Sequence, residues 1–171
     1  MTELAITTTE LVIKTSFAPK ISFALHQNSI PVLLELSIEN SGDQGREDLV
    51  LSLHSVPAFF RSRDWQISKI SPQQRYTITD LDLNLDGGQL FRLTEAEKSQ
   101  IVFELRQGET SLCRLEQSVA LLARNEWGGL NQFPELAAAF VRPNDPAVDR
   151  VLRKAADLLH QVGKKSALEG Y

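Results

Sequence analysis

The sequence predicts a mainly β protein: an immunoglobulin-like antiparallel β-sandwich over residues 1–123, followed by a helical extension over residues 124–171. Three observations predict this. Apolar and polar residues alternate along the first 122 positions, turn residues recur at the roughly 8–12-residue spacing of sandwiches, and the periodicity becomes helical after residue 123. A small barrel is the alternative arrangement of the same strands.

Alternation marks each strand, because successive side chains of a strand point to opposite faces. Residues 32–40 predict one apolar face, made of Val32, Leu34, Leu36 and Ile38. A turn at residues 40–43 follows, and Pro57 ends the next strand. The remaining apolar faces consist of Leu49, Leu51 and Leu53; Trp65 and Ile67; Leu81, Leu83 and Leu85; Ile101, Phe103 and Leu105; and Cys113, Leu115, Val119 and Leu121.

Between these strands, Asp86-Gly87-Gly88 and Gln107-Gly108-Glu109 predict turns, and residues 93–98 predict one helical turn inside a crossover. The alternation changes parity twice. Leu4 and Ile6 precede Leu11 and Ile13, and Tyr76 and Ile78 precede Leu81. Such a change needs a bulge or bend, often where a strand passes between sheets. About eight strands with one apolar face each therefore predict two packed sheets.

After residue 123 the sequence predicts a tight loop, Asn125–Gly129, and a short helix, Pro134–Phe140. Asp145 and Pro146 then begin a second helix that ends near Gly163. Its apolar positions form one helical stripe: Val148, Val151, Leu152, Ala155, Leu159 and Val162. This stripe needs a cover, which could be the sandwich, a downstream domain or a second copy of the chain.

The composition sets limits on partners and compartment. Apolar residues make up 42% of the 171 residues, enough to fill a core, and the net charge is −4. Residues 1–130 hold 12 basic and 17 acidic side chains, so no basic surface for nucleic acid is expected. A single cysteine, no signal peptide and no membrane-length apolar run predict a cytoplasmic location without a membrane contact.

The side chains that could carry chemistry favour packing or solvent roles instead. His26, His54 and His160 have no second ligand at metal spacing, and Cys113 falls on an apolar strand face without a base beside it. The acids around Asp82 and Asp86 alternate with leucines, and they lack the closing Glu of a calcium loop. The sequence therefore predicts no catalytic residue, no metal site and no cofactor.

Trp127 is the most informative single residue. Its structural interpretation, favoured over direct ligand contact, is that it plugs the end of the sandwich beside two glycines that allow a sharp turn. The functional version is a rigid joint between the sandwich and whatever follows residue 171. The candidate joint residues are Asn125, Trp127, Gly128, Gly129, Pro134 and Phe140.

One family resemblance rests on the segments 122–129 (LARNEWGG), 133–144 (FPELAAAFVRPN) and 166–171 (SALEGY). They resemble the N-terminal domain-of-unknown-function region of very large bacterial proteins. Those proteins continue into a transglutaminase-like segment, a superfamily 1 helicase and often a Vsr-like endonuclease, and they are associated with antiphage defence. The resemblance implies a front module whose partners are downstream domains, with all catalytic motifs beyond residue 171.

Three function classes compete. The first is a non-catalytic interaction or scaffold module of such a helicase–nuclease protein, without nucleic-acid binding of its own. The second is a carbohydrate- or peptide-binding sandwich, which would need exposed aromatic side chains at one end. The third is an enzyme that uses Cys113 or an acid pair. Self-association of the chain is a separate hypothesis.

Overall fold

The computed structural model describes residues 10–129, 137–138, 140–141 and 145–163. The chain divides into two compact units, Met1–Pro134 and Glu135–Tyr171, and each is described by itself. The first unit is the predicted two-sheet sandwich, and the second contains the predicted helix. The fold class expected from the sequence, a mainly β immunoglobulin-like sandwich with a C-terminal helical extension, is confirmed.

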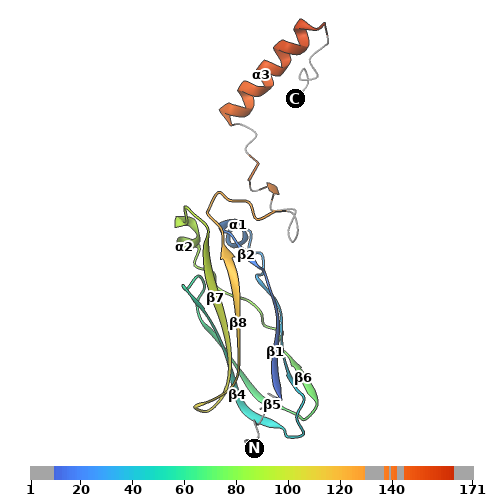
Figure 1. Ribbon diagram of the computed structural model, residues 1–171, viewed down its shortest axis with the longest axis vertical. Helices are drawn as coiled ribbons and strands as arrows, with labels where there is room; N and C mark the ends of the chain where they lie inside the picture. Colours follow the sequence, from blue (N-terminus) through green and yellow to red (C-terminus); the bar gives the residue numbers. More distant parts are fainter. Residues whose placement is uncertain (1–9, 130–136, 139, 142–144, 164–171) are drawn as a thin grey trace, which may run out of the picture. The chain divides into compact units, whose positions relative to one another are not determined.

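The sandwich consists of a three-stranded and a five-stranded sheet (Figure 1). The first has the order β1-β3-β6, with β1 Leu11–Phe17, β3 Leu33–Asn40 and β6 Gln74–Thr77. The second has the order β2-β8-β7-β4-β5, with β2 Lys20–Ile21, β8 Thr110–Leu121, β7 Glu97–Gln107, β4 Arg46–Val56 and β5 Arg63–Ile70. All pairings are antiparallel except β2 with β8.

The core lies between the two sheets and is filled by the predicted alternating residues. On β4, Leu49, Leu51 and Leu53 are fully buried, and Leu51 and Leu53 pair with Leu105 and Phe103 on β7. Trp65 and Ile67, Leu36 and Ile38, and Leu11 and Ile13 are buried as expected. Each such side chain contributes about 1.5–3 kcal/mol on transfer from water, so the pattern itself selects the register.

One strand departs from simple alternation. Leu34 is exposed, whereas Leu33 is buried, so the prediction that Leu34 shares a face with Leu36 is wrong. The reason is a bulge: Ser16 pairs with Glu35, but Phe17 pairs with Leu33, which leaves Leu34 without an opposite residue. A bulge adds one residue to a strand and reverses the faces beyond it.

Residues 81–85 form an extended segment but no strand of a ladder, contrary to the prediction. Only Leu85 bridges a residue, Phe60. Side chains of β5 bind the start of the segment: the Trp65 indole Nε1 donates to the Asp80 carbonyl at 2.9 Å, and the Arg63 guanidinium donates to Asp80 and Asp82. Backbone bonds bind its end, since the Arg61 N–H donates to the Asn84 carbonyl at 2.9 Å and the Asp86 N–H to the Phe59 carbonyl at 2.8 Å. The predicted parity is retained, since Leu81, Leu83 and Leu85 are less exposed than their neighbours.

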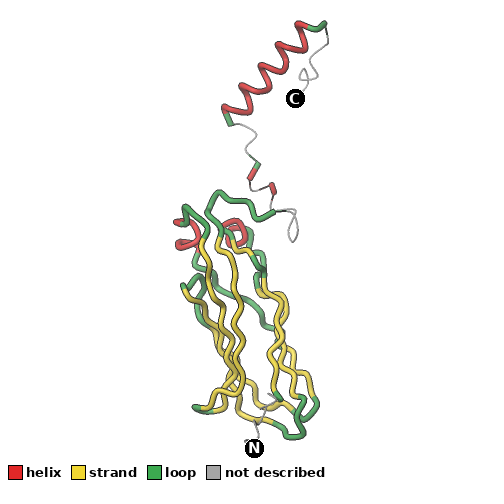
Figure 2. Tube along the Cα trace, viewed as in Figure 1, coloured by secondary structure: helices red, strands yellow, loops and turns green. Residues whose placement is uncertain are grey.

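Two short helices that the sequence analysis missed lie at one end of the sandwich (Figure 2). They are α1 Phe23–Gln27 and α2 Gly87–Arg92. The predicted turn at Asp86-Gly87-Gly88 is the start of α2, where the Asp86 side chain accepts from the Gln89 N–H at 2.9 Å. The predicted helical turn at 93–98 is wrong as well, because β7 begins at Glu97.

The predicted hairpin turn at Gln107–Glu109 is present, with Gly108 at a φ of +56°. The parity switches have two outcomes. The one that begins at Leu4 and Ile6 lies outside the described residues. The other switch, between Ile78 and Leu81, lies where the chain leaves β6 after Thr77 and passes into the segment beside Phe60. This agrees with the bend that the change of parity predicted. Beyond β1, the chain also changes sheet to form β2.

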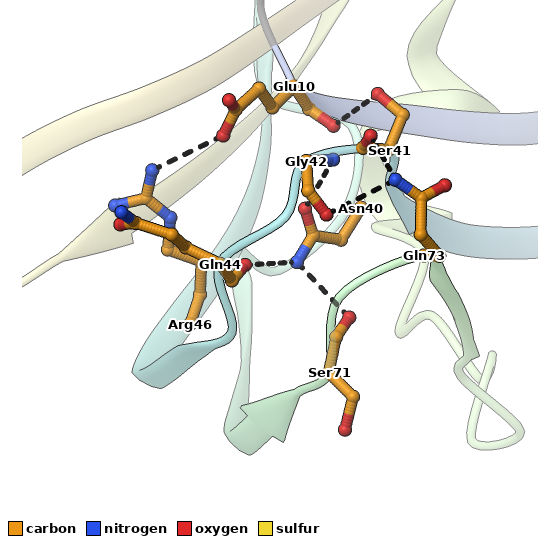
Figure 3. Close-up of polar contacts among 8 residues, drawn as sticks. All are labelled: Glu10, Asn40, Ser41, Gly42, Gln44, Arg46, Ser71 and Gln73. Carbon is orange, nitrogen blue, oxygen red and sulfur yellow. Dashed lines mark hydrogen bonds and ion pairs between the residues drawn. The ribbon is translucent and has the colours of Figure 1, made fainter.

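A buried amide fixes the crossover from β3 to β4 (Figure 3). Asn40 Nδ2 donates to the Gln44 carbonyl at 2.8 Å and to the Ser71 carbonyl at 3.1 Å, and its Oδ1 accepts from the Gly42 N–H at 3.1 Å. Ser41 adds bonds from its N–H and hydroxyl to the Glu10 carbonyl. One side chain thus joins the β3–β4 loop to the β5–β6 loop.

The described helix of the second unit is α3, Pro146–Gln161. Asp145 caps it, with its carboxylate accepting from the Ala147 N–H at 2.9 Å, Pro146 follows, and Gly163 comes just after its end, as predicted. The predicted helix at 134–140 lies mostly outside the described residues. Its described residues, 137–138 and 140, have 3-10 geometry. Among the helices of the described ranges, none is long and apolar enough to span a membrane.

Candidate functional site

Exposed aromatic and basic side chains gather at the end of the sandwich that carries α1 and α2. We call this set the end surface: Lys20, Phe23, Phe91, Arg124 and Trp127. Figure 1 shows that β8 ends beside these helices, so the loop after β8 belongs to the same end. Phe91 is 49% exposed and Trp127 is 46% exposed.

The two phenylalanine rings of the end surface, Phe23 and Phe91, are held by ring contacts. Phe23 of α1 meets Phe91 of α2 edge to face, with ring centroids 5.2 Å apart. The Arg124 guanidinium lies 5.2 Å from the centroid of the Phe91 ring, which is a cation–π contact. The His26 ring lies 5.9 Å from Phe23 and packs closely against Gly87. A ring that is both ordered and exposed loses little entropy on binding.

Hydrogen bonds from both backbone and side chains hold the loop after β8. The Arg124 N–H donates to the Leu93 carbonyl at 2.9 Å, and the Glu126 N–H donates to the Ala123 carbonyl at 2.9 Å. The Glu126 carboxylate accepts from the Ala123 N–H at 3.2 Å. Lys20 on β2 donates to the Gly128 carbonyl at 3.1 Å. These bonds set the backbone that carries Trp127.

The local geometry favours glycine at both positions after Trp127. A Cβ atom at Gly128 would lie 3.0 Å from Cδ1 of Leu122, which is buried beneath the loop. Gly129 has a φ of +95°, a conformation that other residues rarely adopt. The glycines therefore allow the close approach and the turn that the sequence analysis expected of them.

The structure corrects the predicted role of Trp127 and leaves the predicted joint untested. Trp127 does not plug the sandwich, because nearly half of its side chain is exposed. Asn125 and Gly129 are exposed and Gly128 is half-buried. Pro134 lies outside the described residues, and Phe140, half-buried, belongs to the second unit, so the joint stays a prediction.

Sequence reasoning missed most of the end surface. Lys20, Phe23 and Phe91 come from segments that carried no alternation, and only the fold brings them to the loop that carries Arg124 and Gly128. A usable signal existed for Phe91: Asp86, three residues before Gln89, matches a helix cap, and a six-residue helix from there contains the aromatic ring.

The other chemical candidates are not brought together. His26, His54 and His160 lie on α1, β4 and α3. Cys113 is half-buried on β8. Of the acids considered for a calcium site, Asp86 already uses its carboxylate to cap α2. Within the described ranges, no group of three or more His, Cys, Asp or Glu side chains could hold a metal ion.

The acids with shifted pKa values lie on the sheets, away from the end surface. A hydrogen bond from Lys14, with the charges of Lys14 and Arg75, lowers the pKa of Glu39 on β3. A hydrogen bond from Lys69 and its charge lower the pKa of Glu47 on β4, and the same contact raises the pKa of Lys69. These are exposed cross-strand ion pairs, which stabilise a sheet weakly.

Comparison with known proteins gives only distant, partial matches. No family model matches the chain, and no curated protein matches it. Among solved structures, a Bacteroides uniformis beta-glucuronidase is 14% identical with a TM-score of 0.35, over 66% of this chain and 13% of that one. A candidate beta-galactosidase from Bacteroides fragilis is 13% identical with a TM-score of 0.34, over 64% of this chain and 16% of that one. No glycosidase activity is carried over from either.

Proposed function

We propose that this chain is a non-catalytic interaction module that binds a protein partner through its end surface. The observation that carries the proposal is the exposure of two aromatic side chains: Phe91, whose ring lies against the Arg124 guanidinium, and Trp127, on the loop after β8. Trp, Tyr and Arg dominate the binding energy of protein interfaces, because they bury a large area with few rotatable bonds. The end surface combines a tryptophan, two phenylalanines and two cations.

The partner we propose is the remainder of a longer polypeptide, a bacterial helicase–nuclease protein of antiphage defence, acting in the cytoplasm. Two things support this choice. The resemblance over residues 122–144 points to that family, and the end surface includes the loop through which the chain continues toward its second unit. The acidic balance of residues 1–130 supports a protein rather than a nucleic-acid partner.

The test measures binding between this chain and the polypeptide that follows Tyr171 in the natural gene product. We expect Trp127→Ala and Phe91→Ala each to weaken binding about tenfold or more, as hot-spot truncations do. Leu34→Ala is the matched control, since Leu34 is an exposed apolar residue on β3 outside the end surface. Thermal unfolding of each variant checks that the fold is kept. Equal affinities for all four proteins, or a gene product without a following segment, would refute the proposal.

A second candidate function is carbohydrate binding, favoured by the same exposed rings, because sugars stack on aromatic side chains at the ends of sandwiches. A glycan array probed with the chain and with Trp127→Ala separates the two. Saturable glycan binding that disappears in the variant would assign the end surface to a sugar. Salt-sensitive binding to DNA would contradict both functions.

A further inference from the structure

Among the described residues, most of the outer edge of β8 pairs with no strand. On one side β8 pairs with β7 from Thr110 to Leu121. On the other side β2 pairs only with Ala120 and Leu121. Within the described part of the chain, no strand pairs with the outer edge from Thr110 to Val119. An edge of this length is a template for another strand.

The backbone groups that point outward can be assigned. The Ala120 N–H donates outward to the Pro19 carbonyl at 2.9 Å, and the Leu122 N–H donates outward to the Ile21 carbonyl at 2.8 Å. Since alternate residues of a strand direct their backbone groups to the same side, Arg114, Glu116 and Ser118 also point theirs outward. The one irregularity, between Leu105 and Arg106 on β7, lies opposite residues 111–113 and therefore precedes this stretch.

A groove lies beside this edge. A groove of about 360 Å³ separates β8 from β1 and is lined by residues 11–13 and 112–115. Val12 is 43% exposed there, and Cys113 and Leu115 are half-buried. Apolar side chains of an added strand would cover these residues.

The charges on the edge identify the strand that fits. Arg114 and Glu116 form an ion pair at 2.7 Å, with side chains 53% and 52% exposed. In an antiparallel partner with the same sequence the two charges run in the opposite order. A pairing centred on Leu115 places Arg114 opposite Glu116 of the second copy, and Glu116 opposite Arg114 of the second copy. Opposite charges directly across two strands attract.

We propose that two copies of this chain associate through their β8 edges, in an antiparallel pair centred on Leu115. This register allows backbone hydrogen bonds between the two strands and also places opposite charges across from one another. The outward-pointing residues Arg114 and Glu116 meet each other, so their backbone groups exchange hydrogen bonds, and Leu115 meets Leu115 of the second copy in the closer, non-hydrogen-bonded position. Charged edge residues normally discourage pairing; here their order makes the edge selective for itself.

The first test measures the mass of the full chain by sedimentation at concentrations up to about 1 mM, where weak interfaces associate. The wild type should dimerise. Arg114→Glu and Glu116→Arg each place like charges opposite one another twice, and each should weaken the dimer about tenfold. The double variant R114E/E116R exchanges the two charges and should recover wild-type association. A wild type that stays monomeric, or a double variant as weak as the single ones, would overturn the proposal.

The second test fixes the register and separates this edge from the stripe of α3. In a Cys113→Ser background, Leu115→Cys should form a disulfide-linked dimer on oxidation, because opposed residues of a non-hydrogen-bonded pair lie about 4.5 Å apart at Cα, within disulfide reach. Val151→Lys places a charge on the exposed α3 stripe and should leave the dimer unchanged. A dimer lost in Val151→Lys but kept in Arg114→Glu would assign association to α3 and overturn the proposal.

Discussion

Asn40 joins two loops of the sandwich through one buried side chain, and its replacement should be costly. The side chain is 2% exposed and makes three hydrogen bonds, two as donor and one as acceptor. At about 1 kcal/mol for each bond, Asn40→Ala should lower the free energy of unfolding by about 3 kcal/mol. The Gly42 N–H, whose bond to Asn40 is buried, would lose its partner, so the loss should not fall below this figure.

Urea unfolding followed by circular dichroism measures this loss. Asn28→Ala is the matched control, since Asn28 is an exposed residue whose side chain makes one part-buried hydrogen bond, from Nδ2 to the Ala24 carbonyl at 2.9 Å. Its removal should cost about 1 kcal/mol. A loss for Asn40→Ala no larger than that of the control would refute the reasoning, because the loop clamp would then not contribute to stability.

Asn40→Asp tests the direction of the bonds. The carboxylate keeps an acceptor for the Gly42 N–H but turns an oxygen toward the Gln44 and Ser71 carbonyls, where a donor is needed. Burial and these carbonyls should raise the pKa of the new carboxyl group in the folded state. A raised folded pKa means that the neutral form is favoured on folding, so the variant should gain stability as the pH falls through that pKa. Stability that is independent of pH relative to wild type would contradict this.

Three further outcomes follow from the packing and the charges. Asp86→Ala removes the cap of α2 and should cost about 1 kcal/mol in urea unfolding, with a matching loss of order at Phe91 by NMR. Phe59→Ala empties a fully buried site and should cost about 3–5 kcal/mol. The pKa of Glu39, lowered by Lys14, should return toward its usual range in Lys14→Met by NMR titration. Because that pKa is lowered on folding, the contribution of the Lys14 contact is present at neutral pH and is lost as the pH falls through the folded pKa.

The sandwich could be predicted from the sequence because burial of one strand face leaves a direct trace in it. Leu49, Leu51 and Leu53 alternate without interruption, and every one is buried. Alternation reports which face is buried, not whether the backbone pairs with a neighbour. Residues 81–85 therefore keep the parity of a strand although they form no ladder, and isolated bonds from the Arg63 side chain and the Arg61 N–H hold their backbone.

The errors have local physical causes. The bulge at Leu34 depends on how β1 meets β3, and no single strand contains that information. The helices α1 and α2 are five and six residues long, too short for a helical period to show in the sequence. The end surface could not be predicted because it joins Lys20, Phe91 and Arg124, which come from three separate segments of the sequence. Trp127 was recognised as informative, but its exposure depends on the loop that Lys20 and Leu93 hold.

Acrylamide quenching of tryptophan fluorescence tests the binding role of the end surface most directly. The chain has two tryptophans, and Trp65 is 9% exposed whereas Trp127 is 46% exposed, so quenching reports chiefly on Trp127. The proposed partner, a polypeptide following Tyr171, is prepared without tryptophan and added until binding is complete. Quenching of Trp127 should fall sharply in the complex. Unchanged quenching with the partner bound would show that the end surface is not the binding site.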